Sequence, residues 1–203
     1  MAYRLPVDEG RPQRATRRRA IGRAVAGCLS FGLAGYALEA AGAGAASKAG
    51  DARIFKLALE IEYAEEAFYR EALRRGALRG ELREYARSAL AQDGQHLRLL
   101  RTVLGSAAPA RPRFVFGDKT KDEPAFIDTA AKLEDIAVGG YNGQATNLTK
   151  GGLAVAATIV SVEARHAAWI RALAGEVAAP DAVDKPLTAA EVVAGLREIG
   201  LRR

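Results

Sequence analysis

The sequence predicts an all-α protein, a four-helix bundle with an additional C-terminal helix. Four stretches of about 20 to 28 residues repeat apolar side chains at spacings of three and four, which is the period of an amphipathic helix. No alternation typical of strands reaches comparable strength after residue 50. The chain has 203 residues, of which 49% are hydrophobic and 27% are charged, so one domain with a sizeable core is expected. Four long helices joined by loops favour a bundle.

Residues 1–46 are predicted to be an export signal, and residues 47–203 to form the helical domain. The net charge is +6, but residues 1–45 hold seven basic and three acidic side chains, whereas the rest of the chain holds 23 and 21. An arginine run at 17–19 precedes a weakly apolar stretch, 24–38, and then small residues, which is the order of a twin-arginine signal. The basic excess therefore indicates a targeting signal. The charge of the rest of the chain is nearly balanced, which does not indicate binding to nucleic acid.

An uncleaved membrane anchor is the alternative for this leader. Its apolar stretch has about 15 residues, fewer than the roughly 20 that cross a bilayer. Cys28, the only cysteine, precedes the most apolar part of the stretch, where a lipid attachment site is not expected. We therefore expect a protein exported to the periplasm, the cell envelope or the medium, with membrane contact only if the signal is retained. One cysteine also excludes a disulfide framework or a thiolate metal site within the chain.

The first predicted helix covers residues 51–78, with Asp51 as its N-cap, and the second covers residues 80–104 and ends at Gly105. The inward face of the first consists of Ile54, Ala58, Ile61, Glu62, Glu65, Phe68, Tyr69 and Ala72. That of the second consists of Leu82, Ala86, Ala89, Asp93, His96, Leu100 and Val103.

A loop after Gly105 separates the two halves of the bundle, and its apolar segment 114–116 is expected to pack on the helices. The third helix begins near Pro124 and is expected to weaken at the glycines 139, 140 and 143. The fourth covers residues 152–173. A capping box formed by Thr188 and Glu191 then opens the C-terminal helix.

Each of the four long helices is predicted to place acidic side chains on its apolar face. The only two histidines of the chain follow an acidic residue by three positions, and the full set is Glu62, Asp93 with His96, Glu134, and Glu163 with His166. An unpaired carboxylate in a bundle core is destabilising by several kcal/mol, and the same faces contain almost no Lys or Arg. A pair of metal ions would neutralise these acids, and a buried polar network without metal is the alternative.

The spacing of these residues suits metal binding. Positions i and i+3 lie on one face of a helix, so a carboxylate and an imidazole can converge on one ion. One carboxylate from each of two helices and an acid-x-x-His pair from each of the other two is the ligand pattern of di-iron and di-manganese bundles. Oxygen and imidazole donors without thiolate favour two iron or manganese ions. No catalytic residue beyond the metal ligands is indicated.

Three segments resemble the ferritin-like superfamily. They are residues 61–69 (IEYAEEAFY), Leu133-Glu134-Asp135 through Gly140-Tyr141, and residues 162–167 (VEARHA). More narrowly, they are similar to exported bacterial ferritin-like proteins related to plant desiccation-related proteins, and the resemblance covers roughly residues 51–200. It implies a carboxylate-bridged dinuclear iron centre that oxidises Fe(II) or handles peroxide, with metal ions and dioxygen or peroxide as partners.

Asp93 departs from that pattern, in which a glutamate is expected. Its side chain is one methylene shorter and reaches about 1.5 Å less far. Gly94 follows directly and would let the backbone approach the centre in compensation. Otherwise the metal site has degenerated, and the protein is a non-catalytic stress- or desiccation-related envelope protein that keeps the fold.

Three further side chains are candidates near this centre. Glu65 follows Glu62 by three positions and is either an extra ligand or a hydrogen-bond partner of Tyr141 or Tyr85. Tyr69 and Tyr141 are either outer hydrogen-bond donors that orient the carboxylates or ordinary core tyrosines.

Overall fold

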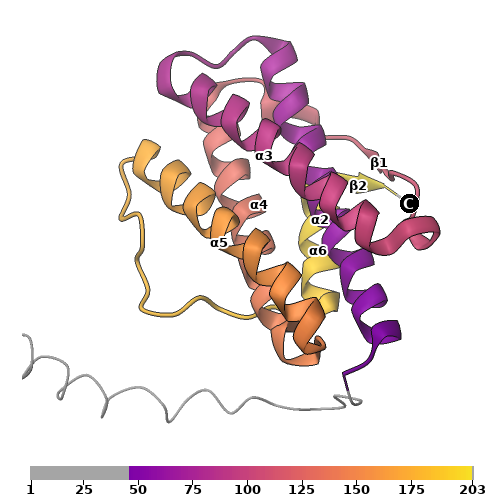
Figure 1. Cartoon of the computed structure of the whole chain (residues 1–203). Helices are drawn as coiled ribbons and strands as arrows, with labels where there is room; N and C mark the ends of the chain where they lie inside the picture. Colours follow the sequence, from indigo (N-terminus) through magenta and orange to yellow (C-terminus); the bar gives the residue numbers. More distant parts are fainter. Residues whose placement is uncertain (1–45, 203) are drawn as a thin grey trace, which may run out of the picture. The chain divides into compact units, whose positions relative to one another are not determined.

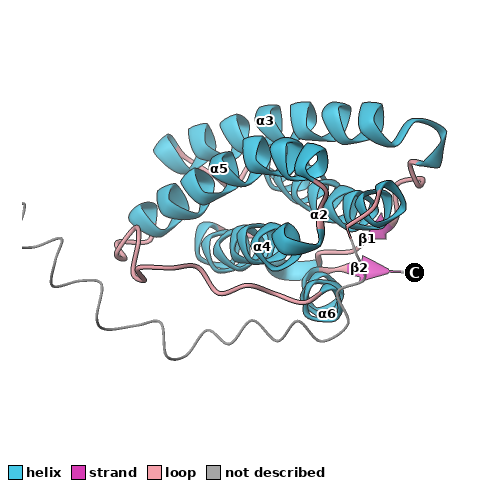
Figure 2. Cartoon of the chain, turned by 60° about the horizontal axis from the view of Figure 1, so that its bottom comes forward, coloured by secondary structure: helices cyan, strands magenta, loops and turns pink. Residues whose placement is uncertain are grey.

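The computed structural model describes residues 46–202 and confirms the predicted all-α bundle with an additional helix. The predicted export signal and Cys28 lie outside the described residues. Helix α2 (Lys48–Arg75) and α3 (Gly80–Leu104) pack together as one hairpin, and α4 (Glu123–Gln144) and α5 (Lys150–Leu173) as a second. Helix α6 (Ala189–Ile199) packs on α4 outside the four long helices (Figures 1 and 2). Three short 3-10 turns join the helices: Gly105–Ala107, Gly117–Thr120 and Ala145–Asn147.

The ends of α2 differ from the prediction. Ser47 is the N-cap, and its hydroxyl accepts a hydrogen bond from the Gly50 backbone. Asp51 lies in the first turn instead, where its carboxylate accepts bonds from the backbone and hydroxyl of Thr149 at 2.8 and 2.6 Å. Asp51 thus ties the start of α2 to the start of α5. The helix stops at Gly76, whose φ of 70° favours glycine.

Helix α4 continues through the three glycines that were expected to weaken its end. Pro124 stands in its first turn behind the N-cap Asp122, as the sequence indicates. Gly139 and Gly143 face the segment before α6, and a Cβ on Gly143 would lie 1.9 Å from the Leu187 carbonyl oxygen. These glycines therefore allow close packing of that segment on α4.

The connection after α3 is held by aromatic packing and a short sheet that the sequence did not reveal. Strand β1 (Arg113–Phe114) pairs antiparallel with β2 (Leu201–Arg202). Phe116 is buried against Phe68 with ring centroids 5.4 Å apart. Val115 is 41% exposed, so the expectation that the whole segment packs inward was wrong for this residue.

By length and composition, α5 is the one helix of the described chain that could cross a membrane, with a mean hydropathy of 1.3. It nevertheless buries Glu163 and His166 in the bundle. Both α5 and α3 contribute polar side chains to the interior. Val103, at the end of α3, is 44% exposed and does not belong to the predicted inward face.

Candidate metal centre

All six predicted ligand side chains meet at the centre of the four long helices. Helix α2 supplies Glu62, α4 supplies Glu134, and α3 and α5 each supply an acid and a histidine one turn apart. The four carboxylates are completely buried, and the two imidazoles are 3% and 8% exposed. The centre therefore lies out of contact with bulk water.

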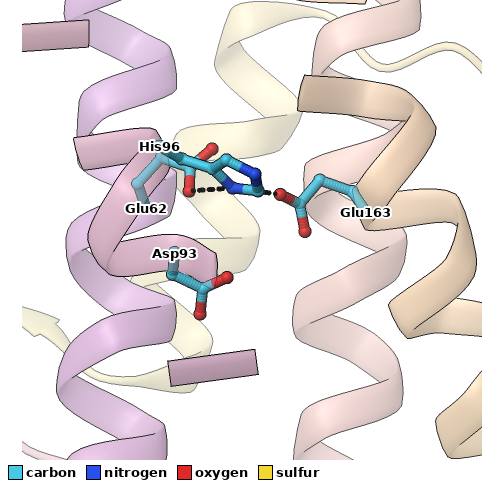
Figure 3. A group of neighbouring side chains, drawn as sticks. All are labelled: Glu62, Asp93, His96 and Glu163. Carbon is cyan, nitrogen blue, oxygen red and sulfur yellow. Dashed lines mark hydrogen bonds and ion pairs between the residues drawn. The ribbon is translucent and has the colours of Figure 1, made fainter. Parts of the chain in front are cut away.

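The first ligand group contains Glu62, Asp93, His96 and Glu163, each of which offers one donor atom within 4.8 Å of the others. Figure 3 shows the His96 imidazole between the carboxylates of Glu62 and Glu163. Its Nδ1 lies 2.8 Å from Glu163 Oε1 and 3.2 Å from Glu62 Oε2. One nitrogen has a single hydrogen to share, so it satisfies one of these two carboxylates and leaves the other without a donor.

The second ligand group contains Glu134, Glu163 and His166. His166 Nδ1 lies 3.1 Å from Glu163 Oε2 and 3.6 Å from Glu134 Oε2. Glu163 thus belongs to both groups, with one oxygen toward each histidine. Glu163 could therefore offer one carboxylate oxygen to a cation in each group.

Tyrosine hydroxyls hold two of the carboxylates from outside the groups. Tyr141 donates to Glu62 Oε1 at 2.7 Å. Tyr69 and Tyr85 both donate to Glu134 Oε1, Tyr85 at 2.8 Å, and their own hydroxyl oxygens are 2.9 Å apart. Each carboxylate therefore keeps its other oxygen turned toward the histidines.

Two site residues were missed by the sequence analysis. Gln92 was given no role, and Tyr85 was considered only as a hydrogen-bond partner of Glu65. His166 Nε2 lies 2.8 Å from Gln92 Oε1, which can only accept, so Nε2 carries a hydrogen and Nδ1 faces the carboxylates. Tyr85 stands eight positions before Asp93, two turns away on the same face of α3, and that spacing was the available signal. Gln92 gave no such signal, because it lies beside the apolar face.

A comparison with known protein families matches residues 50–176 to the ferritin-like domain. This match covers more than half of the chain, including the whole centre. The chain belongs to the ferritin-like family. No curated protein matches.

The centre of this ferritin-like protein has donor groups that are compatible with metal binding. Five buried carboxylate oxygens have no hydrogen-bond partner: both of Glu65, both of Asp93, and Glu134 Oε2. A sixth, Glu163 Oε1, shares the single His96 Nδ1 with Glu62. A buried charged oxygen without a partner destabilises the fold by several kcal/mol unless a proton or a cation neutralises it. Cations bound among these oxygens would supply the missing partners, so the residues fit metal ions.

The titration behaviour of the ferritin-like centre shows how strongly it needs positive charge. Burial and the neighbouring Glu163 raise the pKa of Glu62 to about 7, and burial also raises the pKa of Asp93 and Glu134. Burial would lower the pKa of His96 and His166, but the hydrogen bonds that they donate to carboxylates raise these pKa values to about 9 and about 11. Protons therefore neutralise the metal-free centre.

Glu163 is the one member of the set whose pKa falls. Burial acts to raise it, but hydrogen bonds with His166 and His96 bring it down to about 2. Glu163 is thus the carboxylate that stays ionised, which suits its place in both ligand groups.

One alternative offered for Glu65 was wrong, and the compensation expected at Gly94 stays a prediction. A Cβ on Gly94 would meet only an Arg98 side-chain nitrogen, at 3.9 Å, so no other helix packs closely against this glycine. Glu65 makes no hydrogen bond with Tyr141 or Tyr85, because its two oxygens have no partner.

Proposed function

We propose that this ferritin-like protein binds two iron or manganese ions and uses them to oxidise Fe(II) or to handle peroxide. The observation that carries the proposal is a cluster of buried carboxylates beside two imidazoles, in which five carboxylate oxygens have no hydrogen-bond partner. When bound, such ions supply one-electron redox chemistry with dioxygen or peroxide.

The protein's own residues would prepare the centre for this chemistry. Glu163 would be a ligand in both groups. In the first group His96 and Glu62 would be further ligands, and in the second group His166 and Glu134 would be. Tyr141 and the pair of Tyr69 and Tyr85 would fix the orientation of the end carboxylates. The surrounding apolar core would keep out bulk water.

We also propose that the protein acts outside the cytoplasm. The support is the leader sequence, with its arginine run at 17–19 and the apolar stretch behind it. A protein exported after folding would acquire its ions before it leaves the cell. Expression with the native leader, followed by fractionation and sequencing of the mature N-terminus, tests this point, and recovery of the uncleaved chain in the cytoplasm contradicts it.

Metal analysis of the mature domain tests the proposed centre. We expect close to two equivalents of iron after anaerobic Fe(II) loading and removal of free metal, and a higher Tm for the loaded protein, because a ligand that binds only the folded state stabilises it. Glu163→Gln should abolish the increase in Tm. Loading below about 0.2 equivalents, far short of one ion, would refute the proposal.

A second candidate function is a non-catalytic stress- or desiccation-related envelope protein. Asp93 favours it, since its shorter side chain belongs to the first ligand group and not to the second. On this reading iron leaves the Tm of the wild type unchanged, and Glu163→Gln has the same small effect with and without iron.

A further inference from the structure

Glu65 is a completely buried glutamate that the two ligand groups do not include. It lies on α2 one turn after Glu62, with an exposure of 0%. Neither of its carboxylate oxygens has a hydrogen-bond partner in the described part of the chain. Burial of a carboxylate without a hydrogen-bond partner is destabilising, so this position calls for an explanation.

The carboxylates that act on the pKa of Glu65 are those of the two ligand groups. Burial is the largest cause of its raised pKa, and Glu163, Glu134, Glu62 and Asp93 follow in that order. Those four carboxylates come from all four long helices and from both ligand groups. Glu65 is therefore buried within electrostatic reach of carboxylates from both ligand groups.

The two ligand groups are unequal, and the inequality arises at Asp93. Glu163 on α5 serves both groups, but Asp93, its counterpart on α3, serves the first alone. Its Oδ1 lies 3.9 Å from His166 Nδ1, and Figure 3 shows its carboxylate below His96, reaching into the space between the helices. The second group is left with three ligand residues where the first has four.

We propose that Glu65 is a seventh ligand residue, and that its carboxylate supplies to the second metal ion the oxygen that Asp93 is too short to supply. The inference rests on the proposed metal function and deepens it. Glu65 lies on α2, the other helix of the α2–α3 hairpin. A ligand oxygen on α2 would therefore replace the oxygen that Asp93 on α3 does not supply.

A purely structural role for Glu65 does not fit its surroundings. A buried carboxyl kept for stability would donate or accept a hydrogen bond, as Glu66 does in its ion pairs with Arg70 and Arg111. The tyrosine hydroxyls of the centre do not donate to Glu65. Tyr141 donates to Glu62, and Tyr69 and Tyr85 donate to Glu134.

Anaerobic calorimetric titration of the mature domain with Mn²⁺ and with Fe²⁺ tests the proposal. We expect two equivalents for the wild type, and for Glu65→Gln one ion bound as before and the second bound about tenfold or more weakly. Glu66→Gln is the matched control, because it removes the next buried carboxylate of α2 outside the centre and should keep both ions.

Restoration of the missing methylene gives the decisive comparison. Asp93→Glu introduced into the Glu65→Gln variant should recover the second equivalent, since a glutamate there reaches both groups. The Tm increment on Mn²⁺ addition provides a second measurement for every variant. If Glu65→Gln does not fold, Glu65→Asp takes its place, because it keeps the charge and withdraws it by one methylene.

The outcomes separate this inference from the proposed function. Two equivalents of unchanged affinity in Glu65→Gln or Glu65→Asp, with loss of both ions in Glu163→Gln, overturn the role of Glu65 and leave the metal centre standing. A second equivalent that stays lost in the Asp93→Glu double variant overturns the compensation. A wild-type domain that binds no metal overturns the proposed function and the inference with it.

Discussion

Gln92 determines which nitrogen of His166 faces the centre. Its Oε1 accepts from Nε2 at 2.8 Å, and its own Nε2 lies 3.2 Å from the Ser88 hydroxyl on the preceding turn. The amide is therefore held in one orientation, and His166 Nδ1 is directed at Glu163 and Glu134. A histidine oriented in this way needs no rearrangement to bind an ion.

Replacement of Gln92 by alanine should weaken the binding of one metal ion and leave the binding of the other unchanged. We expect the affinity of the second group for Mn²⁺ to fall about 10- to 100-fold, because a ligating imidazole loses the partner that orients it. Gln95→Ala, one turn further along α3 on its exposed side, is the control. Equal titration curves for the two variants would show that Gln92 plays no part in metal binding.

The elements are held around the centre by contacts at their ends. Asp51 joins the first turns of α2 and α5, and β1 pairs with β2 to hold the loop after α3 against the end of the chain. The segment before α6 lies on the glycines of α4, with the Leu187 backbone donating to the Gly139 carbonyl at 2.8 Å. The four ligand-bearing helices are thereby held at their ends, away from the centre.

Gly143→Ala should destabilise the domain, whereas Gly94→Ala should not. A Cβ at position 143 would overlap the Leu187 backbone and push the segment before α6 away, at about 1–3 kcal/mol. A Cβ at position 94 makes only an ordinary contact with the Arg98 side chain, at 3.9 Å, and raises helix propensity, so a gain of up to about 1 kcal/mol is expected. Urea unfolding of the two variants measures both values. A Gly143→Ala protein as stable as the wild type would contradict the close packing on α4.

For the whole molecule, the charge at the centre makes the stability of the metal-free domain depend on pH. His96 and His166 have folded pKa values of about 9 and about 11, against 6.5 for a free imidazole. The folded protein thus holds protons that the unfolded chain releases above pH 6.5, so stability falls as pH rises through that range. Glu62, raised from 4.5 to about 7, acts in the same direction at lower pH.

We therefore expect the Tm of the metal-free domain to decrease from pH 6.5 to pH 9. With saturating Mn²⁺ the decrease should vanish or reverse, because the ligands bind metal in their deprotonated forms. Thermal melts followed by circular dichroism, with chelator or with Mn²⁺, measure both trends. A metal-free Tm that increases over this range would show that the two imidazoles are not held protonated by the carboxylates.

The sequence by itself determined the bundle, the four helices that carry the centre and the six side chains that meet there. Helical period and the i, i+3 spacing of Asp93 with His96 and Glu163 with His166 are local properties, so they can be read along one chain. Helix ends were predicted less well: Asp51 was expected to be the N-cap of α2, but Ser47 caps the helix and Asp51 contacts Thr149 instead.

Only the tertiary structure decided how the polar groups pair across the helices. It showed that Glu163 is shared by both groups, that Tyr85 and Gln92 support Glu134 and His166, and that Glu65 is left without a partner. It also kept α4 helical through its glycines by packing another segment on them. These outcomes depend on distances of a few ångströms between residues far apart in sequence, and no periodicity within one helix encodes such distances.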